Sequence, residues 1–373
     1  MLALFHRRFN SYGINGKINS RALQTVLTGI ALKAIVFQAP NKIVVKEAPK
    51  PKIGKDDVLV RMKAIAICNS TDMHFLKGEI EGITYPLPPG KPGHECAGEI
   101  AEVGSNVKDL KIGDRVVPGP VYALPCNHCY YCIQGKEELC QNPGFADYAY
   151  AEYLKIPARY CYKMPKNVSY EEAALIDLLA CTLHGAKRAS FSYGETAVII
   201  GQGPAGLLLT QLAKLAGISK IIAVDISDSR LEFAKKLGAD ATVNSAKENL
   251  VEKVLELTNK KGADIAVDAV GRPVTASQAV DVLKPAGRAI IFGFHLKPAQ
   301  INMARVFDKE LEIKASFRTV GELDYRTSMD LVANGKIDLK SLITHHMPLE
   351  QLRHALELIE KDLEGVVKVI LRP

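Results

Sequence analysis

The stretch AVIIGQGPAG, residues 197–206, joins an apolar run directly to a pattern of three glycines. The run Ala197–Ile200 predicts a buried strand, and Pro204–Ala216 predicts the helix that follows it. Gly-x-Gly-x-x-Gly between a strand and a helix is typical of dinucleotide binding, because the glycines allow the turn, the approach of a pyrophosphate and close helix packing. The pyrophosphate then meets the helix N-terminus. We therefore expect the cofactor to contact five loop residues, Gly201, Gly203, Pro204, Ala205 and Gly206.

Asp225 ends the next predicted strand, Lys220–Val224, and follows Gly206 by 19 residues. A carboxylate in this position accepts hydrogen bonds from the hydroxyls of the adenosine ribose and repels a 2′-phosphate, so it favours NAD over NADP. The alternative is a structural role, in which Asp225 only caps the end of the strand. We expect NAD as the cofactor.

Around this motif, residues 196–315 alternate apolar strands with helical patterns. The further strands predicted are Ala241–Val243, Asp264–Asp268, Ala289–Phe292 and Leu311–Lys314, and the further helices are Arg230–Leu237 and Lys247–Leu257. Strands that are apolar throughout and separated by helices predict a parallel sheet with both faces covered.

The chain before this region has a different texture, with short β-rich runs separated by Gly and Pro turns over residues 33–166. The runs are Lys33–Phe37, Val58–Arg61, Cys96–Val103 and Asp114–Val117. They predict a compact β-barrel-like domain. After residue 315 the chain gives two helical patterns and a last strand, Val366–Leu371, which we expect to return to the first domain.

Four cysteines lie within 15 residues, with the spacing Cys126-x2-Cys129-x2-Cys132-x7-Cys140. Four thiolates so arranged suit tetrahedral zinc in a closed structural site. An iron–sulfur cluster is the rival interpretation, but the long last gap and the absence of a Cys-Pro pair argue against it. Clustered cysteines in an enzyme-sized chain without a secretory signal also favour metal over disulfides. His128 lies inside the loop, where four thiols already complete the coordination.

A second group of metal-ligand residues precedes this loop. It contains Cys68 and His74, in the segment CNSTDMH, and the pair His94-Glu95 just before a predicted strand. Catalytic zinc keeps about three protein ligands from separate elements and leaves one position for water or substrate. A His-Glu pair alone is more often a surface feature. Together with an upstream cysteine and the four-cysteine loop, it predicts a catalytic zinc site.

The order of these features resembles the zinc-containing medium-chain alcohol dehydrogenases, over residues 32–373. Within that family, Tyr162-Lys163-Met164-Pro165 and Ala174-Leu175-Ile176-Asp177 are similar to the sorbitol and threonine dehydrogenase branch. The resemblance implies an α/β architecture of two domains. They are a GroES-like β-barrel catalytic domain, residues 32–176 and 316–373 with a structural-zinc lobe at about 119–145, and a Rossmann doubly wound parallel-sheet dinucleotide-binding domain, residues 177–315.

The resemblance also implies two zinc ions per subunit and names the ligands of the catalytic one as Cys68, His94 and Glu95. Asp177 falls where this branch has a Glu that binds zinc directly or through water. Because Asp is one methylene shorter, we expect the water-bridged role. Asp72 is expected to orient His94 through its second ring nitrogen.

A proton relay is implied as well, from the alcohol through a side-chain hydroxyl and the nicotinamide ribose to His74, while hydride passes to NAD. The family has two residues between the cysteine and the following aspartate, whereas three separate Cys68 from Asp72 here. Ser70 and Thr71 are therefore both candidates for the hydroxyl, and we prefer Thr71.

The expected substrate class is inferred from Arg318. The segment Ser316-Phe317-Arg318 resembles the Phe-Arg element of polyol dehydrogenases, in which the Arg contacts the substrate. A surface role for Arg318 has equal weight. A polyol, sugar alcohol or cyclitol is the expected substrate, with L-threonine or a small diol as the alternative.

Arg230 resembles the residue that contacts the adenosine ribose, and it could tolerate NADP. A zinc-free quinone or enone reductase, or a non-enzymatic binding protein of this fold, would be expected to lack metal ligands that this chain has.

Composition and charge exclude other classes of protein. The formal net charge of +7 is concentrated in residues 1–46, which carry seven Lys and Arg and no Asp or Glu. The rest of the chain is near neutral, so we expect no nucleic acid partner. The sequence contains no uninterrupted run of 18 apolar residues, so it predicts no membrane span.

Residues 1–31 form an extension for which three interpretations stay open: disorder, a start-site artefact, or an acid-free presequence. We expect a cytoplasmic enzyme. The resemblance implies a homo-oligomer, a dimer or tetramer, that meets along one edge of the dinucleotide sheet near Ala289–Phe294.

Overall fold

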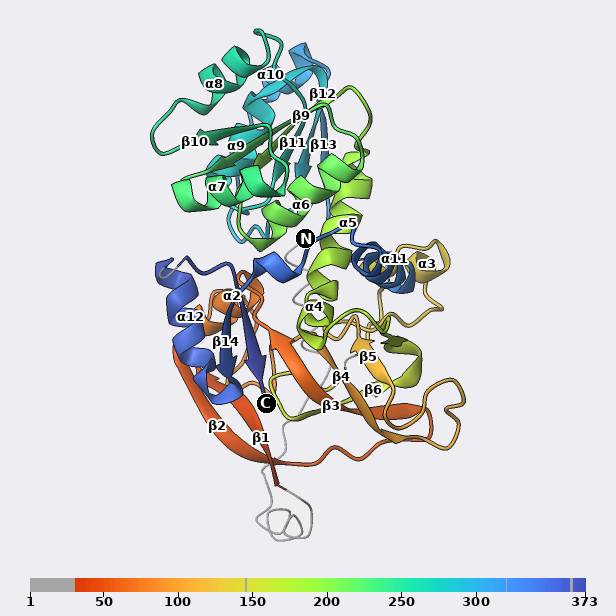
Figure 1. Ribbon diagram of the computed structural model, residues 1–373. Helices are drawn as coiled ribbons and strands as arrows, with labels where there is room; N and C mark the ends of the chain where they lie inside the picture. Colours follow the sequence, from red (N-terminus) through yellow and green to blue (C-terminus); the bar gives the residue numbers. More distant parts are fainter. Residues whose placement is uncertain (1–30, 145, 320, 363–364) are drawn as a thin grey trace.

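The computed structural model describes residues 31–144, 146–319, 321–362 and 365–373. The extension expected at residues 1–31 lies outside the described residues except for Ala31. The chain forms an elongated molecule of two units, one above the other in Figure 1, and each unit has its own large sheet.

The upper unit contains a six-stranded sheet in the order β10-β9-β8-β11-β12-β13, and every strand pair in it is parallel. Its strands are β8 Thr196–Ile200, β9 Lys220–Asp225, β10 Ala241–Asn244, β11 Ala263–Asp268, β12 Leu283–Ile291 and β13 Glu312–Ala315. Its helices are α6 Pro204–Leu215, α7 Asp228–Leu237, α8 Leu250–Leu257, α9 Pro273–Asp281 and α10 Met303–Asp308.

Strand β8 shows why the sheet is covered on both sides. Ala197 and Ile199 join a core cluster with helices α6 and α7, whereas Val198 and Ile200 join a cluster with α8 and α9. Alternate side chains of a strand point to opposite faces, so a strand that is apolar throughout must be buried twice. The predicted parallel sheet with two covered faces is confirmed.

Two details of this unit differ from expectation. Helix α8 begins at Leu250 rather than at Lys247, because the side chain of Asn249 accepts hydrogen bonds from the first helical N–H groups. The segment Ala289–Phe294 was expected at an edge of the sheet, and this is wrong. Strand β12 pairs with β11 on one side and with β13 on the other, so β13 is the edge strand.

The lower unit contains a seven-stranded, mainly antiparallel sheet in the order β14-β15-β3-β4-β5-β7, with β6 paired to β3. Its strands are β3 Asp57–Ala66, β4 Glu95–Val103, β5 Arg115–Pro118, β6 Tyr153–Pro157, β7 Cys161–Lys163, β14 Ile343–Pro348 and β15 Lys368–Arg372, beside the hairpin of β1 Ala31–Ala39 and β2 Lys42–Pro49. Its helices are α2 Thr71–Lys77, α3 Tyr130–Ile133, α4 Tyr170–Ala174 and α12 Leu352–Lys361. The last strand of the chain, β15, thus lies beside β3.

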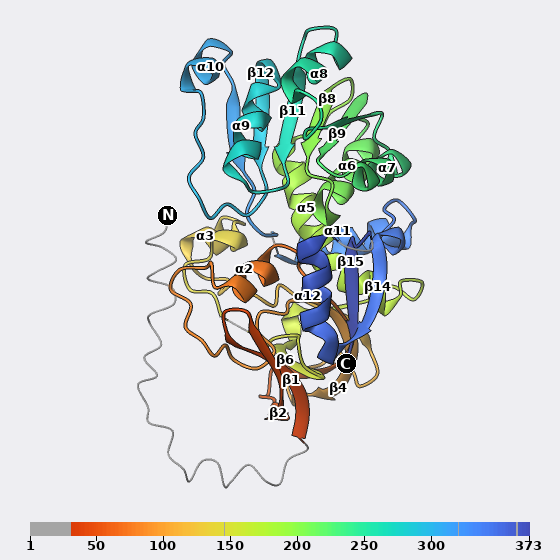
Figure 2. The same cartoon turned by 90° about the vertical axis from the view of Figure 1, so that its left-hand side faces the viewer.

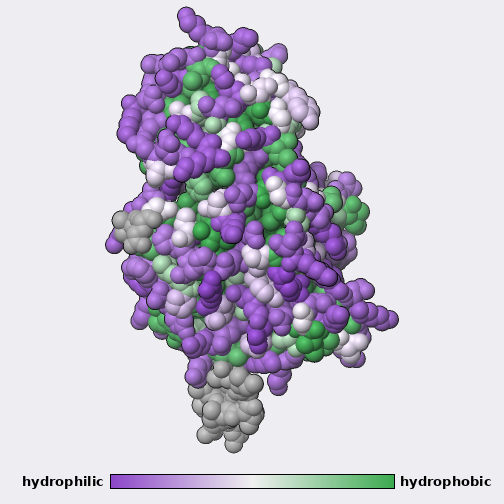
Figure 3. Space-filling model, in the orientation of Figure 1, coloured by the Kyte–Doolittle hydropathy of each residue, from purple (hydrophilic) through white to green (hydrophobic). Residues whose placement is uncertain are grey.

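Two helices lie between the units, α5 Ile176–Ala189 and α11 Gly321–Ala333, side by side in Figures 1 and 2. One core cluster contains Ala64 and Ala97 of the lower sheet, Leu179 of α5 and Ile199 of the upper sheet, so apolar packing is continuous across the junction. The outline of the molecule narrows there, and hydrophobic residues show on this face (Figure 3). Within the described ranges, no helix combines the length and apolar character needed to cross a bilayer.

Candidate active site and metal centres

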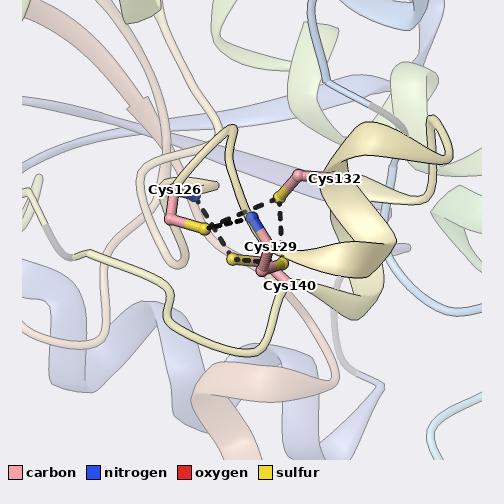
Figure 4. A group of neighbouring side chains, drawn as sticks. All are labelled: Cys126, Cys129, Cys132 and Cys140. Atoms are coloured by element: carbon pink, nitrogen blue, oxygen red, sulfur yellow. Dashed lines mark hydrogen bonds between the residues drawn. The ribbon is translucent and has the colours of Figure 1, made fainter.

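The four cysteines of the lower unit converge in space, with their sulfur atoms turned toward one another (Figure 4). The Sγ–Sγ distances are 3.5 Å for Cys129–Cys132 and 4.0 Å for both Cys126–Cys132 and Cys129–Cys140. A zinc ion bonded to four thiolates at about 2.3 Å places its sulfurs about 3.8 Å apart. The donor set and its spacing therefore fit tetrahedral zinc.

Backbone N–H groups point at these sulfurs and favour their ionised form. The N–H of Cys126 lies 3.2 Å from Cys140 Sγ, and that of Gln141 lies 3.4 Å from Cys129 Sγ. The hydrogen bonds from the N–H groups of Gln141 and Cys132 are the largest of the effects that together lower the pKa of Cys129 to about 6. His128 is turned away, with Nδ1 2.8 Å from the carbonyl of Cys126, as expected for a residue outside the coordination.

A second convergence joins Cys68, His94 and Glu95, whose potential ligand atoms all lie within 4.8 Å of one another. The antiparallel pairing of β3 and β4 is responsible, because it sets Ala66 opposite Glu95 and so brings the residues after β3 beside the start of β4. His94 and Glu95 are buried, and Cys68 is half-buried.

The ring of His94 is oriented by a backbone carbonyl. Its Nδ1 lies 2.9 Å from the carbonyl oxygen of Pro92, and donation from Nδ1 leaves Nε2 free for a metal. His94 was expected to form this hydrogen bond with Asp72, but its Nδ1 bonds the Pro92 carbonyl instead. Asp72 lies one helical turn beyond Cys68, and its carboxylate accepts the Cys68 N–H at 2.8 Å and the hydroxyl of Tyr150.

The charges around His94 favour a cation at this place. Burial lowers the pKa of His94, but the hydrogen bond with Cys68 and the nearby charges of Cys68, Asp72 and Asp177 outweigh it and raise that pKa well above its usual value. A site that draws a proton onto an imidazole among acidic groups offers the same negative surroundings to a metal ion.

Glu95 has a partner that sequence reasoning missed. Lys368, the first residue of β15, donates from Nζ to Glu95 Oε2 and to the carbonyl of Ile67, and both charged side chains are 1% exposed. A lysine in a terminal strand is ordinarily exposed, and only the pairing of β15 with β3 could show that this one is buried.

Asp177 lies on α5 next to this group but does not belong to it, because its carboxylate is not among the ligand atoms within 4.8 Å. It accepts a hydrogen bond from the hydroxyl of Tyr325 on α11, a second residue that the sequence did not indicate. Burial raises the pKa of Asp177, against the opposing effects of the His94 charge and the Tyr325 hydroxyl.

The remaining catalytic candidates come from the segment after β13 and from the start of α2. The Arg318 guanidinium lies 5.5 Å from the centre of the Tyr122 ring, and that ring meets the His94 ring edge-on at 5.8 Å. His74 is half-buried, with Nδ1 2.6 Å from Glu79 Oε2. Thr71, the first residue of α2, is half-buried, whereas Ser70 before it is exposed.

The glycine loop has the geometry that dinucleotide binding requires. Gly201 has φ of +90°, and a Cβ on Gly206 would lie 1.7 Å from the carbonyl oxygen of Gly201. A Cβ on Gly203 would meet nothing within 4 Å, so the backbone is open to a ligand there. Gly203 is also the N-cap of α6, with Pro204 and Ala205 beginning the helix.

Asp225, at the end of β9, is 7% exposed and accepts backbone hydrogen bonds from Gln202 at 2.6 Å and from Ile226 at 2.8 Å. It thus braces the glycine loop. Arg230 lies on α7, where its Nη2 is 2.7 Å from Asp362 Oδ1, beyond the end of α12 in the lower unit.

Asp268 and His295 were missed by the sequence analysis and lie on the other side of the glycine loop. The sheet order places β11 next to β8, opposite to β9. Asp268 is fully buried at the end of β11, and Oδ2 is 2.7 Å from His295 Nε2 in the loop after β12. The loops after β11 and β12 therefore lie beside the glycine loop on the side away from Asp225.

Comparison with known proteins agrees with this geometry. A family model described as alcohol dehydrogenase GroES-like domain matches residues 54–166, and one described as zinc-binding dehydrogenase matches residues 204–334. Sorbitol dehydrogenase of Bacillus subtilis is 34% identical over 351 residues, which cover 92% of this chain and 97% of that protein. Probable D-xylulose reductase A of Aspergillus clavatus is 36% identical over 332 residues, or 86% and 92% of the two chains.

Among solved structures, a protein of Sinorhizobium meliloti 1021 described as a zinc-binding dehydrogenase bound to NADP superposes with a TM-score of 0.84 and 30% identity, over 92% of this chain and 99% of that one. The expected family and the expected fold are confirmed. Zinc and a nicotinamide cofactor follow from the family. The chain belongs to the zinc-containing medium-chain alcohol dehydrogenases, in the branch of the sorbitol dehydrogenases.

Proposed function

We propose that this enzyme oxidises polyols, such as sugar alcohols or cyclitols, with NAD as the acceptor and two zinc ions per subunit. The observation that carries the proposal is the ring of Tyr122, which contacts both the His94 ring and the Arg318 guanidinium, so that one aromatic ring lies between the guanidinium and the second cluster of ligands. A guanidinium donates several hydrogen bonds in a fixed geometry, which suits a substrate with several hydroxyl groups. Similarity to proteins named sorbitol dehydrogenase and D-xylulose reductase supports the same class.

Cys68, His94 and Glu95 would hold the catalytic zinc, and Cys126, Cys129, Cys132 and Cys140 the structural one. When bound, zinc polarises the oxygen of the alcohol, and the nicotinamide ring accepts a hydride from the carbon that bears this oxygen. The chain supplies the orientation of the ligands. Pro92 fixes the ring of His94, Asp72 fixes the loop of Cys68, and Lys368 balances the charge of Glu95.

Proton removal falls to the start of α2. Thr71 is the better-placed hydroxyl, because it is half-buried whereas Ser70 is exposed. His74 follows one turn later, with its carboxylate partner Glu79 open to solvent on its outer side. This order gives the proton a short path from the buried site to water.

NAD is supported over NADP by Asp225 and Arg230. The Asp225 carboxylate repels a 2′-phosphate, and the ion pair with Asp362 engages the Arg230 guanidinium that could otherwise bind one. Asp225→Asn removes the charge and keeps one oxygen acceptor, so one of the two backbone hydrogen bonds from Gln202 and Ile226 is lost with it. We expect the ratio of kcat/KM for NAD to that for NADP to fall by about 10-fold or more, a charge effect of roughly 1.4 kcal/mol. An unchanged ratio would assign Asp225 to loop bracing alone.

Steady-state assays of NAD reduction test the substrate class directly. We expect the highest kcat/KM among sorbitol, xylitol, galactitol and a cyclitol, and lower values for 2,3-butanediol and L-threonine. Arg318→Ala is expected to raise KM for the best polyol about 10-fold and to leave KM for NAD unchanged. Arg326→Ala, on the exposed face of α11, is the control. Threonine or the diol as the best substrate would overturn the polyol assignment.

We also propose a homo-oligomer, either a dimer or a tetramer. Strand β13 ends the described sheet, and Ile313 on it is 43% exposed, which supports an edge that pairs with another subunit. Light scattering on the purified enzyme measures the state, and a monomer at micromolar concentration would contradict the proposal.

A further inference from the structure

Asp177 and Tyr325 form a buried pair that joins the two helices at the centre of the molecule. The Tyr325 hydroxyl donates to Asp177 Oδ1, across 148 residues of sequence. Tyr325 is fully buried and Asp177 is 9% exposed, so little water competes for this hydrogen bond. Buried polar groups need hydrogen-bond partners, and this phenol and this carboxylate are partners of each other.

The phenol has no room to move away. A Cβ on Gly119 would lie 2.4 Å from the Tyr325 hydroxyl oxygen, so the backbone at Gly119 packs directly on the end of the ring. The Tyr162 ring lies against the other side, with centroids 5.2 Å apart. Gly119 and Tyr162 thus fix the direction in which the hydroxyl points.

The Asp177 carboxylate is fixed in turn, close to the metal ligands but not among them. The ligand atoms of Cys68, His94 and Glu95 converge within 4.8 Å without it. One of its oxygens is engaged by Tyr325, and its side chain is one methylene shorter than the Glu expected at this position. Direct coordination through the other oxygen would require the carboxylate to shift toward the three ligands while Tyr325 holds Oδ1.

We propose that Tyr325 is a positioning residue that holds Asp177 outside the zinc coordination, with its second oxygen presented to a hydroxyl group of the substrate or to a zinc-bound water. This inference rests on the proposed function for the identity of the substrate. It assigns Asp177 to substrate or water binding, and it explains how a shorter carboxylate keeps a defined place.

A double-mutant cycle on the whole enzyme tests the positioning role. Tyr325→Phe keeps the ring against Gly119 and removes only the hydroxyl. We expect kcat/KM for the best polyol to fall about 10-fold, as for other residues that orient a group at a metal site, with KM for NAD unchanged. In an Asp177→Asn background the same change should cost less than about twofold, since Tyr325 acts through the carboxylate. Equal losses in both backgrounds would overturn the proposal. Tyr85→Phe, which removes a hydroxyl bonded to the Phe75 carbonyl, is the control.

Cobalt substitution gives a readout that does not depend on activity or on the Tyr325 variant. Co²⁺ at the catalytic site absorbs visible light in bands that depend on its ligands. We expect band intensities that indicate the same coordination number in the wild-type enzyme and in Asp177→Asn, because the carboxylate is not a ligand. Intensities that indicate one ligand fewer in Asp177→Asn would show direct coordination and overturn the proposal, whereas a small shift of the bands is the effect of a lost contact with a metal-bound water. If the wild type oxidises no alcohol, the proposed function fails, whereas this comparison still decides the place of Asp177.

Discussion

The two clusters of metal ligands in the lower unit are built in opposite ways. The four cysteines come from one loop of 15 residues, and their sulfurs are contacted by backbone N–H groups of the same loop. The set of Cys68, His94 and Glu95 comes from two elements. Lys368, which bonds Glu95, and the tyrosines that bond the neighbouring Asp72 and Asp177 come from the rest of the chain. The first cluster needs one folded loop, and the second needs the whole lower unit together with α11.

This difference matches two uses of a metal. A shell of four thiolates leaves no position for a substrate, so its ion can only stabilise the loop. A mixed set of three ligands leaves a position open and is surrounded by groups that tune it. If this is correct, damage to one cluster should change stability and damage to the other should change chemistry.

The largest effect is expected from Cys68→Ala. Loss of one of three ligands should empty the catalytic site and lower kcat/KM by at least about 10³-fold, because the metal supplies several kcal/mol of transition-state stabilisation. The melting temperature should change by no more than roughly 4 °C. Metal analysis should give one zinc per chain. Cys161→Ala, a buried thiol in neither cluster, is the control. Full activity with two zinc ions would refute the assignment of Cys68.

Cys129→Ala should show the reverse pattern. Its zinc is expected to be lost, with a fall of about 3 kcal/mol in the free energy of unfolding and roughly 6–12 °C in melting temperature. The residual activity at low temperature should stay within about 10-fold of the wild type, since the loop lies outside the reacting group. Thermal melts and metal analysis measure both quantities. A variant that keeps its stability and loses all activity would break the comparison.

The same difference explains what could be predicted from sequence. The zinc site of the four-cysteine loop could be predicted from spacing, because ligands that are close in sequence within one short loop must also lie close in space. The strand β8 and the glycine loop follow from an apolar run and from the turn that Gly201 and Gly206 require. These features are local, and the structure agrees with the positions expected for them.

The partners of the dispersed cluster could not be predicted in this way. Lys368 and Tyr325 are ordinary residues of a strand and a helix until the fold brings them to Glu95 and Asp177. Asp72 was expected to bond His94, but its place one turn after Cys68 gives its carboxylate a nearer donor. Contacts between distant segments depend on which strands become neighbours, and spacing carries no information on that.

Lys368→Met sharpens the comparison, because it removes a partner of the dispersed cluster from the far end of the chain. Glu95 would keep its burial and lose the hydrogen-bond donor that orients its carboxylate, so we expect weaker zinc binding at the catalytic site and a 10- to 100-fold fall in kcat/KM at limiting zinc, estimated roughly from such supporting residues. The four-cysteine zinc should stay bound. Titration with a chelator, followed by metal analysis, separates the two ions. Lys361→Met, an exposed residue of α12, is the control, and equal loss of both ions would contradict the prediction.

The smallest effect concerns the upper unit, which holds neither cluster and so provides the reference for both. Asp264, at the start of β11, accepts the Thr196 N–H at 2.8 Å and pairs with Lys284. Burial raises the pKa of Asp264, but the hydrogen bonds from Lys284 and Thr196 outweigh it and hold that pKa below its ordinary value. The folded state therefore keeps the charge at a pH where the unfolded chain takes up a proton, so the stabilisation is complete above the unfolded pKa.

Asp264→Asn should then cost about 1 kcal/mol at pH 7, the size of a partly exposed ion pair with one backbone hydrogen bond. As pH falls below about 4 and through the folded pKa, Asp264 is protonated in the wild type, and the difference between the two proteins should shrink. Chemical denaturation from pH 7 to pH 3 measures it, with both proteins stripped of zinc by the same treatment so that thiolate protonation affects them equally. Asp281→Asn, in the more exposed pair with Arg305, is the control with a smaller expected loss. A loss that stays constant down to pH 3 would mean that the substitution acts through packing and not through the charge of Asp264.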